Sequence, residues 1–189
     1  MEITTTFDAK TRNAWRAWLA ANHAGQSEIW LLLRRGQGGS ITYLDAVEEA
    51  LCFGWIDGIA KRQLDATGQR FTPRRARSHW TELNKERARR LIRAGKMTEA
   101  GLRTLPDLSQ TDVRVPPDIR ARLEAKPGAW KSFEEFPTLY QRVRLGYVEE
   151  VRKRDPAEWE KRLSNFVAKT AKNDMYGNWD DSGLPRTEE

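Results

Sequence analysis

The stretch Ala50-Leu51-Cys52-Phe53-Gly54-Trp55-Ile56-Asp57-Gly58 decides the fold, because a helix ends and a strand begins within it. Residues 42–52 place apolar side chains at helical spacing, and Thr42 supplies an oxygen that can cap the first turn. Gly54 ends this helix, since helix ends often require a residue in the left-handed conformation. Residues 55–61 then read as a strand.

Two further strands follow from the sequence on either side. Residues 28–34 form a short continuous apolar run, which is typical of a strand covered on both faces. A turn at residues 65–68 lets residues 69–72 return as the hairpin partner of residues 55–61, and Pro73 ends that partner. The predicted fold class is therefore α+β: a small mixed β-sheet of about three strands with flanking helices, followed by a helical C-terminal part.

The chain divides by composition into four parts. Residues 1–104 form the α+β central module, and residues 105–116, with scattered Asp, Ser, Thr and Pro, form a linker. Residues 117–173 are predicted to be helical, and Asp155-Pro156-Ala157-Glu158 starts their last helix because it combines a cap with a proline at the first position. Residues 174–189 are polar and are predicted to be a disordered tail.

Positive charge is concentrated in the central module. The chain has 189 residues and a formal net charge of +6. Between Lys61 and Arg103 there are 13 basic and 4 acidic residues, so the rest of the chain is acidic on balance. An excess of positive charge favours anionic partners, although it says nothing about the fold.

The sequence predicts a cytoplasmic protein that does not insert into membranes. Cys52 is the single cysteine, so no internal disulfide can form. The first residues lack the basic and apolar regions of a secretion signal, and no apolar run approaches transmembrane length.

The central part of the chain carries a long ordered series of motifs: Thr42-Tyr43-x-x-Ala46-x-x-x-Ala50-Leu51-Cys52-Phe53-Gly54-Trp55-Ile56-Asp57-Gly58, Arg70-Phe71-Thr72-Pro73-Arg74, Ser78-x-Trp80-Thr81-x-x-Asn84 and Gly95-x-Met97-Thr98-x-Ala100-Gly101. These motifs resemble those of the YdeI/OmpD-associated (bacteriocin-protection, OmdA-like) family of bacterial proteins. The resemblance covers most of residues 7–173 and is strongest over 42–102. It implies a role in stress or bacteriocin protection and carries over no catalytic residues.

The C-terminal part departs from the family pattern at one point. The family tends to carry a lysine and then Glu-Thr-Arg ahead of its last helix, where this chain has Arg152-Lys153-Arg154-Asp155-Pro156-Ala157. No role tied to that tripeptide is therefore expected here.

A run of arginines just before a predicted helix start indicates an anion site. Arg70, Arg74, Arg75 and Arg77 combine guanidinium forks with the free N–H groups of that helix. The competing interpretation is a solvated basic face partly neutralised by nearby glutamates. We predict a binding module whose groove takes a phosphate-bearing or otherwise anionic ligand and is lined by Trp55, Asp57, Arg70, Arg74, Ser78, Trp80 and Asn84.

Asp57 has two interpretations of its own. Strands disfavour both Asp and Gly, so the Asp57-Gly58 pair needs a reason. Asp57 is either a carboxylate on the floor of a groove or a structural group, which forms an ion pair with an arginine of the basic run or a hydrogen bond to a helix start. A small enzyme using Asp57 or Cys52 is a further alternative. A Cys52 nucleophile would need a base, which could be His23, His79 or an acid such as Asp57.

A nucleic-acid-associated stress protein is the remaining alternative, and it would use Lys85, Arg89 and Arg93, which lie on one helix face beside the same arginines. One cysteine and two histidines lack the spacing of zinc ligands, so neither a metal nor another cofactor is expected. The glycine-rich residues 36–40 match no phosphate-binding pattern and read as a flexible connection. A protein partner is the expectation if no anion binds.

Overall fold

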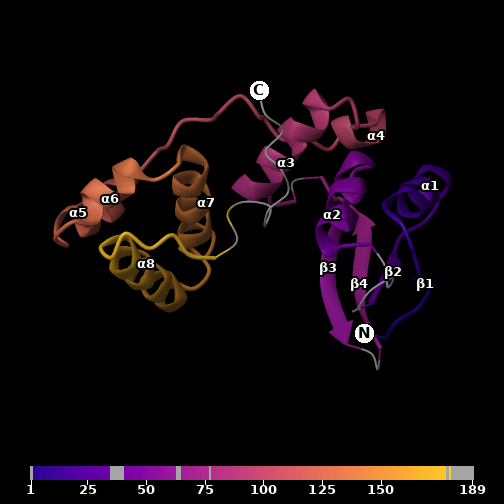
Figure 1. The fold of residues 1–189 in the computed structure, drawn as a ribbon, viewed down its shortest axis with the longest axis horizontal. Helices are drawn as coiled ribbons and strands as arrows, with labels where there is room; N and C mark the ends of the chain where they lie inside the picture. The colour runs from indigo at the N-terminus through magenta and orange to yellow at the C-terminus, as the bar shows by residue number, and fades with distance from the viewer. Residues whose placement is uncertain (1, 35–40, 63–64, 77, 178, 180–189) are drawn as a thin grey trace. The chain divides into compact units, whose positions relative to one another are not determined.

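A computed structural model describes residues 2–34, 41–62, 65–76, 78–177 and 179 (Figure 1). The chain forms two compact units. Residues 1–79 and 86–108 make up the first, and residues 80–85 and 109–189 make up the second. The predictions for the glycine-rich residues 36–40, for Arg77 and for most of the tail fall outside the described residues.

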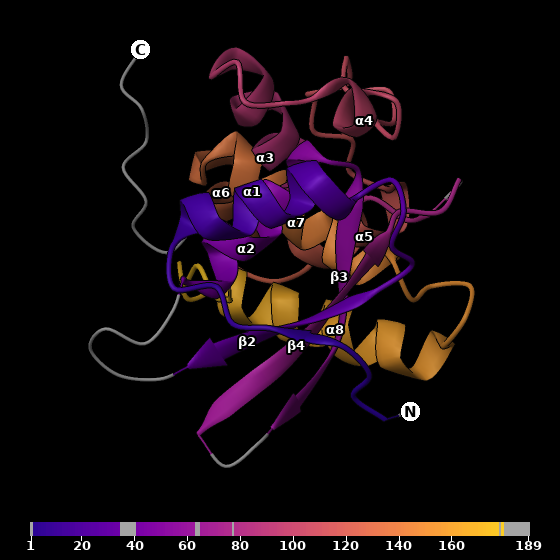
Figure 2. The same ribbon diagram turned by 90° about the vertical axis from the view of Figure 1, so that its right-hand side faces the viewer.

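The first unit is built on a four-stranded mixed sheet in the order β1-β2-β4-β3. Figure 2 labels the three longer strands, β2, β4 and β3. Its strands are β1 (Thr6–Phe7), β2 (Ile29–Arg34), β3 (Trp55–Arg62) and β4 (Ala66–Pro73). Only β1 and β2 run parallel. The predicted α+β class with a mixed sheet is confirmed. The prediction of about three strands missed β1, since two residues are too short to show an alternating pattern.

Three helices accompany the sheet: α1 (Arg12–Asn22), α2 (Tyr43–Cys52) and α4 (Glu99–Leu102), with α3 (Glu82–Arg93) beginning in the second unit and ending in the first. The indole N–H of Trp15 on α1 donates to the Ala46 carbonyl on α2 at 3.0 Å. The ring of Trp15 also lies 5.4 Å from that of Phe71 on β4. This buried indole therefore joins both helices to the sheet.

The C-terminal end of α2 is closed by a later segment. Thr98 donates a 2.6 Å hydrogen bond from its hydroxyl and a 3.1 Å hydrogen bond from its N–H to the Cys52 carbonyl. Gly101 lies so close that an added Cβ would stand 2.3 Å from that carbonyl oxygen. Gly54 has φ +73°, a conformation that favours glycine, so the predicted end of α2 is confirmed.

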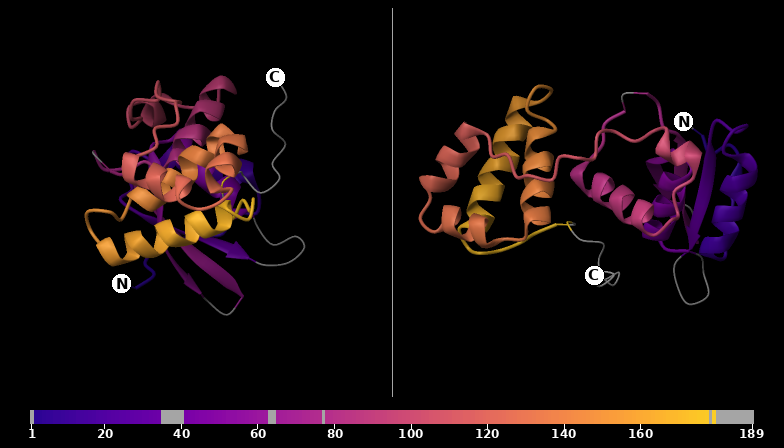
Figure 3. Two further views of the ribbon diagram at one scale, coloured as in Figure 1. Left: turned by 90° about the vertical axis from the view of Figure 1, so that its left-hand side faces the viewer. Right: turned by 90° about the horizontal axis from the view of Figure 1, so that it is seen from above.

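The second unit is helical, as predicted for the C-terminal part (Figure 3). It contains α5 (Pro117–Glu124), α6 (Ala129–Glu135), α7 (Thr138–Glu149) and α8 (Pro156–Thr170). Phe133 of α6 meets Phe166 of α8 edge-on at 6.0 Å within the core. Asp155 caps α8 by accepting a 3.0 Å hydrogen bond from the N–H of Glu158.

Part of the predicted tail is described, and it contacts helix α7 of the second unit. The N–H of Tyr176 donates to the hydroxyl of Tyr140 at 3.4 Å, and Trp179 meets the Tyr140 ring edge-on at 5.6 Å. Among the described helices, none has both the length and the apolar character that crossing a bilayer demands.

Candidate functional site

Asp57 faces the start of α2 from strand β3. It pairs across the sheet with Phe71, and directly opposed side chains point to the same face. Phe71 is buried under α1, so Asp57 lies on the helix-covered face of the sheet. The phenol of Tyr43 donates a 2.6 Å hydrogen bond to its carboxylate. Burial and this hydrogen bond raise the pKa of Tyr43, so the phenol keeps its proton.

Arg74 lies near Asp57, just after β4. Its N–H donates to the Gly54 carbonyl at 2.8 Å, which ties the residue to the end of α2. The side chain is 7% exposed, and Nη1 donates to the Ser78 hydroxyl at 3.2 Å and to the His79 carbonyl at 3.0 Å. Burial lowers the pKa of Arg74 to about 10, and the charge of Asp57 opposes this shift. Three predicted residues, Asp57, Arg74 and Ser78, are thus brought together.

Arg87 of α3 is a second guanidinium at this place, and sequence reasoning missed it. Burial lowers the pKa of Arg87, while Tyr43, Glu48 and Asp57 act in the opposite direction. Its position four residues before the buried Leu91 puts it on the inward stripe of α3. A charged residue within an apolar stripe was the signal that could have found it.

Arg70 and Asp57 lie on opposite faces of the sheet. Arg70 precedes Phe71 on β4, and successive side chains of a strand point to opposite faces, so Arg70 points away from the face that Phe71 and Asp57 share. There its Nε donates to Glu28 at 2.8 Å. Hydrogen bonds from Thr4 and Arg70 hold the pKa of the Glu28 carboxyl below its usual range. Arg70 therefore belongs to an ion pair outside the Asp57 site.

The other predicted groove residues have structural surroundings of their own. Trp55 is 1% exposed, and its indole N–H donates to the His23 carbonyl at 3.2 Å, so it contributes to the core. Trp80 and Asn84 belong to the second unit. Trp80 is largely buried, and the N–H of Asn84 donates to the Thr81 hydroxyl at 3.2 Å.

The cations of the nucleic-acid alternative, Lys85, Arg89 and Arg93, each have an acidic partner on α3. Lys85 lies 2.6 Å from Glu82. Arg89 lies 3.0 Å and Arg93 3.9 Å from Glu86. Because these glutamates offset much of the positive charge, the helix face offers a phosphate backbone less attraction than its sequence suggested.

Cys52 is poorly suited to act as a nucleophile. The residue is fully buried, and this burial raises the pKa of its thiol to about 11. At neutral pH the thiol is therefore protonated and enclosed. His23 is committed to its own helix, where Nδ1 lies 2.9 Å from the Leu19 carbonyl. Within the described part of the chain, no three His, Cys, Asp or Glu side chains gather as metal ligands would.

Two family models match the chain, one before and one after residues 105–111. The first describes a domain of unknown function, DUF8412, and matches residues 7–104, more than half of the chain. The second is the family described as bacteriocin-protection, YdeI or OmpD-associated (OmdA), and it matches residues 112–173. The chain belongs to the DUF8412 family and carries an OmdA domain. No curated protein and no solved structure matches it significantly.

The OmdA domain thus coincides with helices α5 to α8, whereas the Asp57 site lies in the DUF8412 domain. The predicted resemblance to the OmdA family is confirmed, but its location differs. We expected the strongest match over residues 42–102, and this segment lies in the DUF8412 domain.

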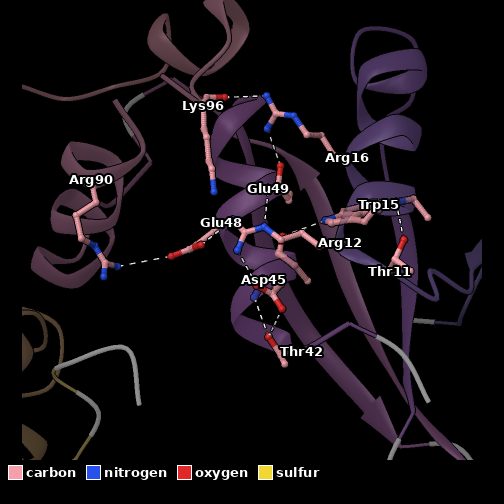
Figure 4. Close-up of polar contacts among 12 residues, drawn as sticks. Thr11, Arg12, Trp15, Arg16, Thr42, Asp45, Glu48, Glu49, Arg90 and Lys96 are labelled. Atoms are coloured by element: carbon pink, nitrogen blue, oxygen red, sulfur yellow. Dashed lines mark hydrogen bonds and ion pairs between the residues drawn. The ribbon is translucent and has the colours of Figure 1, made fainter. Parts of the chain in front are cut away.

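A network of buried carboxylates in the DUF8412 domain escaped sequence reasoning (Figure 4). Arg12 of α1 contacts three acids of α2 at once. Its Nη1 lies 2.6 Å from Asp45, its Nη2 lies 2.8 Å from Glu48 and its Nε lies 2.6 Å from Glu49. Glu48 and Glu49 are only 7% and 2% exposed. Bidentate and forked contacts of this kind fix α1 against α2.

Further cations surround the same two glutamates. Arg16 lies 2.6 Å from Glu49 and donates to the Lys96 carbonyl at 2.9 Å. Arg90 of α3 lies 3.6 Å from Glu48 (Figure 4). The pairs join residues more than 30 positions apart in the chain, so only the tertiary structure reveals them.

Proposed function

We propose that the DUF8412 domain is a binding module for a small phosphate-bearing ligand. The ligand site is the Asp57 cluster, which we define as Tyr43, Asp57, Ser78, Arg74 and Arg87. The observation that carries the proposal is that two guanidinium groups from different elements, the buried Arg74 and the partly buried Arg87, both interact electrostatically with the Asp57 carboxylate.

Charge is the physical reason for expecting an anion. Arg74 and Arg87 both interact electrostatically with Asp57, and Glu48, which also interacts with Arg87, is already engaged by Arg12 at 2.8 Å and by Arg90 at 3.6 Å. Burial disfavours the charged form of a guanidinium, as the lowered pKa of Arg74 shows. A bound phosphate would offset this cost, because guanidinium forks match phosphate oxygens in geometry.

Hydroxyl groups supply further donors beside the two arginines. Tyr43 is 46% exposed and Ser78 is partly exposed, so a ligand can approach them from solvent. Asp57 sets the selectivity of the site, because a carboxylate repels an anion unless arginines or a proton compensate it. The cluster should therefore favour a ligand that places its charge on the arginine side.

The wider role that we propose is protection against bacteriocins from within the cytoplasm. The OmdA domain supports the protective role. A reduced, buried Cys52 suits a reducing compartment. A protein located there acts indirectly, through the ligand or partner that it binds, rather than by intercepting a toxin outside the cell.

The test is thermal unfolding and tryptophan fluorescence of the whole chain with inorganic phosphate, mononucleotides, polyphosphate and short DNA and RNA. Each titration is run at low and at moderate salt. A stabilising shift with a small phosphate compound that survives moderate salt supports the proposal. A shift with polymers alone, erased by salt, supports the nucleic-acid alternative. No shift with any of them overturns both.

Variants locate the site. Arg74→Gln and Arg87→Gln should each weaken phosphate binding by roughly tenfold, the effect of losing one charge-assisted contact. Arg75→Gln is the matched control, because Arg75 is the exposed neighbour of Arg74. Asp57→Asn should tighten binding, whereas an enzyme that relies on Asp57 would lose turnover. Asp65→Asn, at a 73% exposed side chain, should leave binding unchanged.

A further inference from the structure

A pocket of about 520 Å³ lies in the second unit and is lined by none of the residues of the Asp57 cluster. Helices α7 and α8 and the two residues Tyr176 and Gly177 surround it. Its lining combines positive charge with aromatic rings and an amide, from Arg144, Tyr147, Lys161, Arg162, Asn165 and Tyr176. We propose that this pocket binds the carboxylate or phosphate group of a small organic ligand.

Arg144 is the best-positioned cation of the pocket. It is 6% exposed, although it lines the cavity. Its guanidinium carbon lies 5.0 Å from the centre of the Tyr176 ring, 5.6 Å from that of Tyr147 and 5.8 Å from that of Tyr140. Rings on several sides hold a guanidinium by cation–π attraction and restrict its orientation. Arg144 is therefore pre-organised before any ligand arrives.

The backbone of Gly177 packs closely against this guanidinium. Its φ of +69° is a conformation that side chains rarely adopt. A Cβ at this position would stand 2.7 Å from Nη1 of Arg144. The backbone can approach the arginine this closely only because the residue is glycine.

Two further cations give the pocket a positive balance. The guanidinium of Arg162 lies 4.0 Å from the centre of the Tyr147 ring, and its Nη1 donates to the Tyr147 carbonyl at 2.8 Å. Glu158 pairs with Arg162 at 2.9 Å and lies 3.6 Å from Lys161. The described lining residues thus include three cations and one carboxylate. Glu150, which is not among them, lies 3.7 Å from Arg162, and Lys161 keeps an 81% exposed side chain at the rim.

Size and uncharged donors narrow the class of ligand. A volume of about 520 Å³ suits a small molecule and far exceeds a bare anion, so the ligand carries an organic body. Burial raises the pKa of Tyr176, which keeps its hydroxyl protonated and able to donate. The Asn165 amide can pair with either donors or acceptors of that body.

The experiment is titration calorimetry of the whole chain with adenosine monophosphate, adenosine, benzoate and inorganic phosphate at constant ionic strength. Lys161→Gln should weaken binding of the anionic probes by about threefold to tenfold, as expected for one exposed charge at a binding site. Arg144→Gln should weaken it more. Adenosine, which lacks the charge, should bind at least tenfold more weakly than its monophosphate.

Two variants serve as matched controls. Lys131→Gln removes a lysine that is 83% exposed and 3.9 Å from Glu135, in surroundings similar to those of Lys161 but outside the pocket. Arg142→Gln removes a neighbouring arginine of α7 that does not line the pocket. Both should bind the probes as the unmodified chain does. Arg74→Gln should also leave this binding intact, which separates the pocket from the Asp57 cluster.

The outcomes decide the proposal. Weaker binding in Lys161→Gln with unchanged binding in Lys131→Gln supports it. Equal binding in both lysine variants overturns it, and so does the absence of measurable binding by every probe. If Arg144→Gln unfolds, as a melting curve would show, the lysine pair still gives the answer, because both side chains are exposed and their loss spares the fold.

Discussion

The phenol of Tyr43, the first residue of α2, donates a 2.6 Å hydrogen bond to the carboxylate of Asp57 on β3. This bond connects the start of a helix to the middle of a strand at the proposed ligand site. It also satisfies an acid on the helix-covered face of the sheet, where an unsatisfied carboxylate would be costly. The relationship between Tyr43 and Asp57 is therefore both structural and functional.

Tyr43→Phe should lower the free energy of unfolding by about 1 kcal/mol, because a hydrogen bond to a partly exposed carboxylate is lost. Urea denaturation measures the change. A double-mutant cycle with Asp57→Asn isolates the pair, and the coupling should account for most of the loss. Strictly additive effects of the two substitutions would contradict the assigned bond.

Glu49→Gln should destabilise the protein by about 2–3 kcal/mol, because it removes a buried carboxylate that pairs with the partly exposed Arg12 and Arg16. Chemical denaturation is the measurement. Glu99→Gln is the control, since this glutamate is 93% exposed and lies 3.7 Å from Arg103. Its loss should change stability by less than about 0.5 kcal/mol. Similar effects at both positions would show that burial of Glu49 is unimportant.

Gly101→Ala should cost about 2 kcal/mol or more, because the new methyl group would overlap the Cys52 carbonyl and force α4 away from α2. Thermal unfolding would report the loss as a lower Tm. Gly25→Ala provides the comparison, since no atom lies within 4 Å of a Cβ added there. An unchanged Tm in Gly101→Ala would be inconsistent with the close approach of these elements.

Stability should fall as pH rises from about 9 to about 11, through the titration of Cys52. Burial raises the pKa of the folded thiol, so the folded state binds its proton more tightly than the unfolded state. The stabilisation that the protonated Cys52 thiol contributes is complete below pH 9. It is lost as pH rises through the pKa of this thiol in the folded state. Between pH 9 and pH 11 the free energy of unfolding should fall by up to about 3 kcal/mol less in Cys52→Ala than in the unmodified chain. Denaturation curves at several pH values measure this difference. An equally steep slope in the variant would assign the effect to other groups.

Local signals predicted much of the fold. The capping threonine at 42 and Gly54 delimit α2 because each acts on its own turn of helix. The apolar run at residues 28–34 became β2, and Asp155 caps α8. Strand β1 was missed, because pairing with β2 rather than any propensity makes its two residues a strand.

The site was harder to predict, because it depends on which residues the fold brings together. Asp57 and Arg74 lie near each other, as expected from one basic run facing one unusual acid. Arg70 belongs to the same run but points to the opposite face, which only strand register determines. Arg87 lies on the inward stripe of α3, which marks it as unusual, but no local pattern shows that this stripe meets Asp57.

Strand β1 has a consequence for the solubility of shortened chains. Its two residues pair with Trp30 and Leu31 and so cover part of the edge of β2, whose sequence Ile29-Trp30-Leu31-Leu32-Leu33-Arg34 is nearly continuous in apolar side chains. A bare strand edge of this composition is a template for intermolecular cross-β pairing. Removing the first seven residues would uncover that edge, so shortened chains should aggregate through β2, and a purification tag is better attached in front of an intact N-terminus than in place of it.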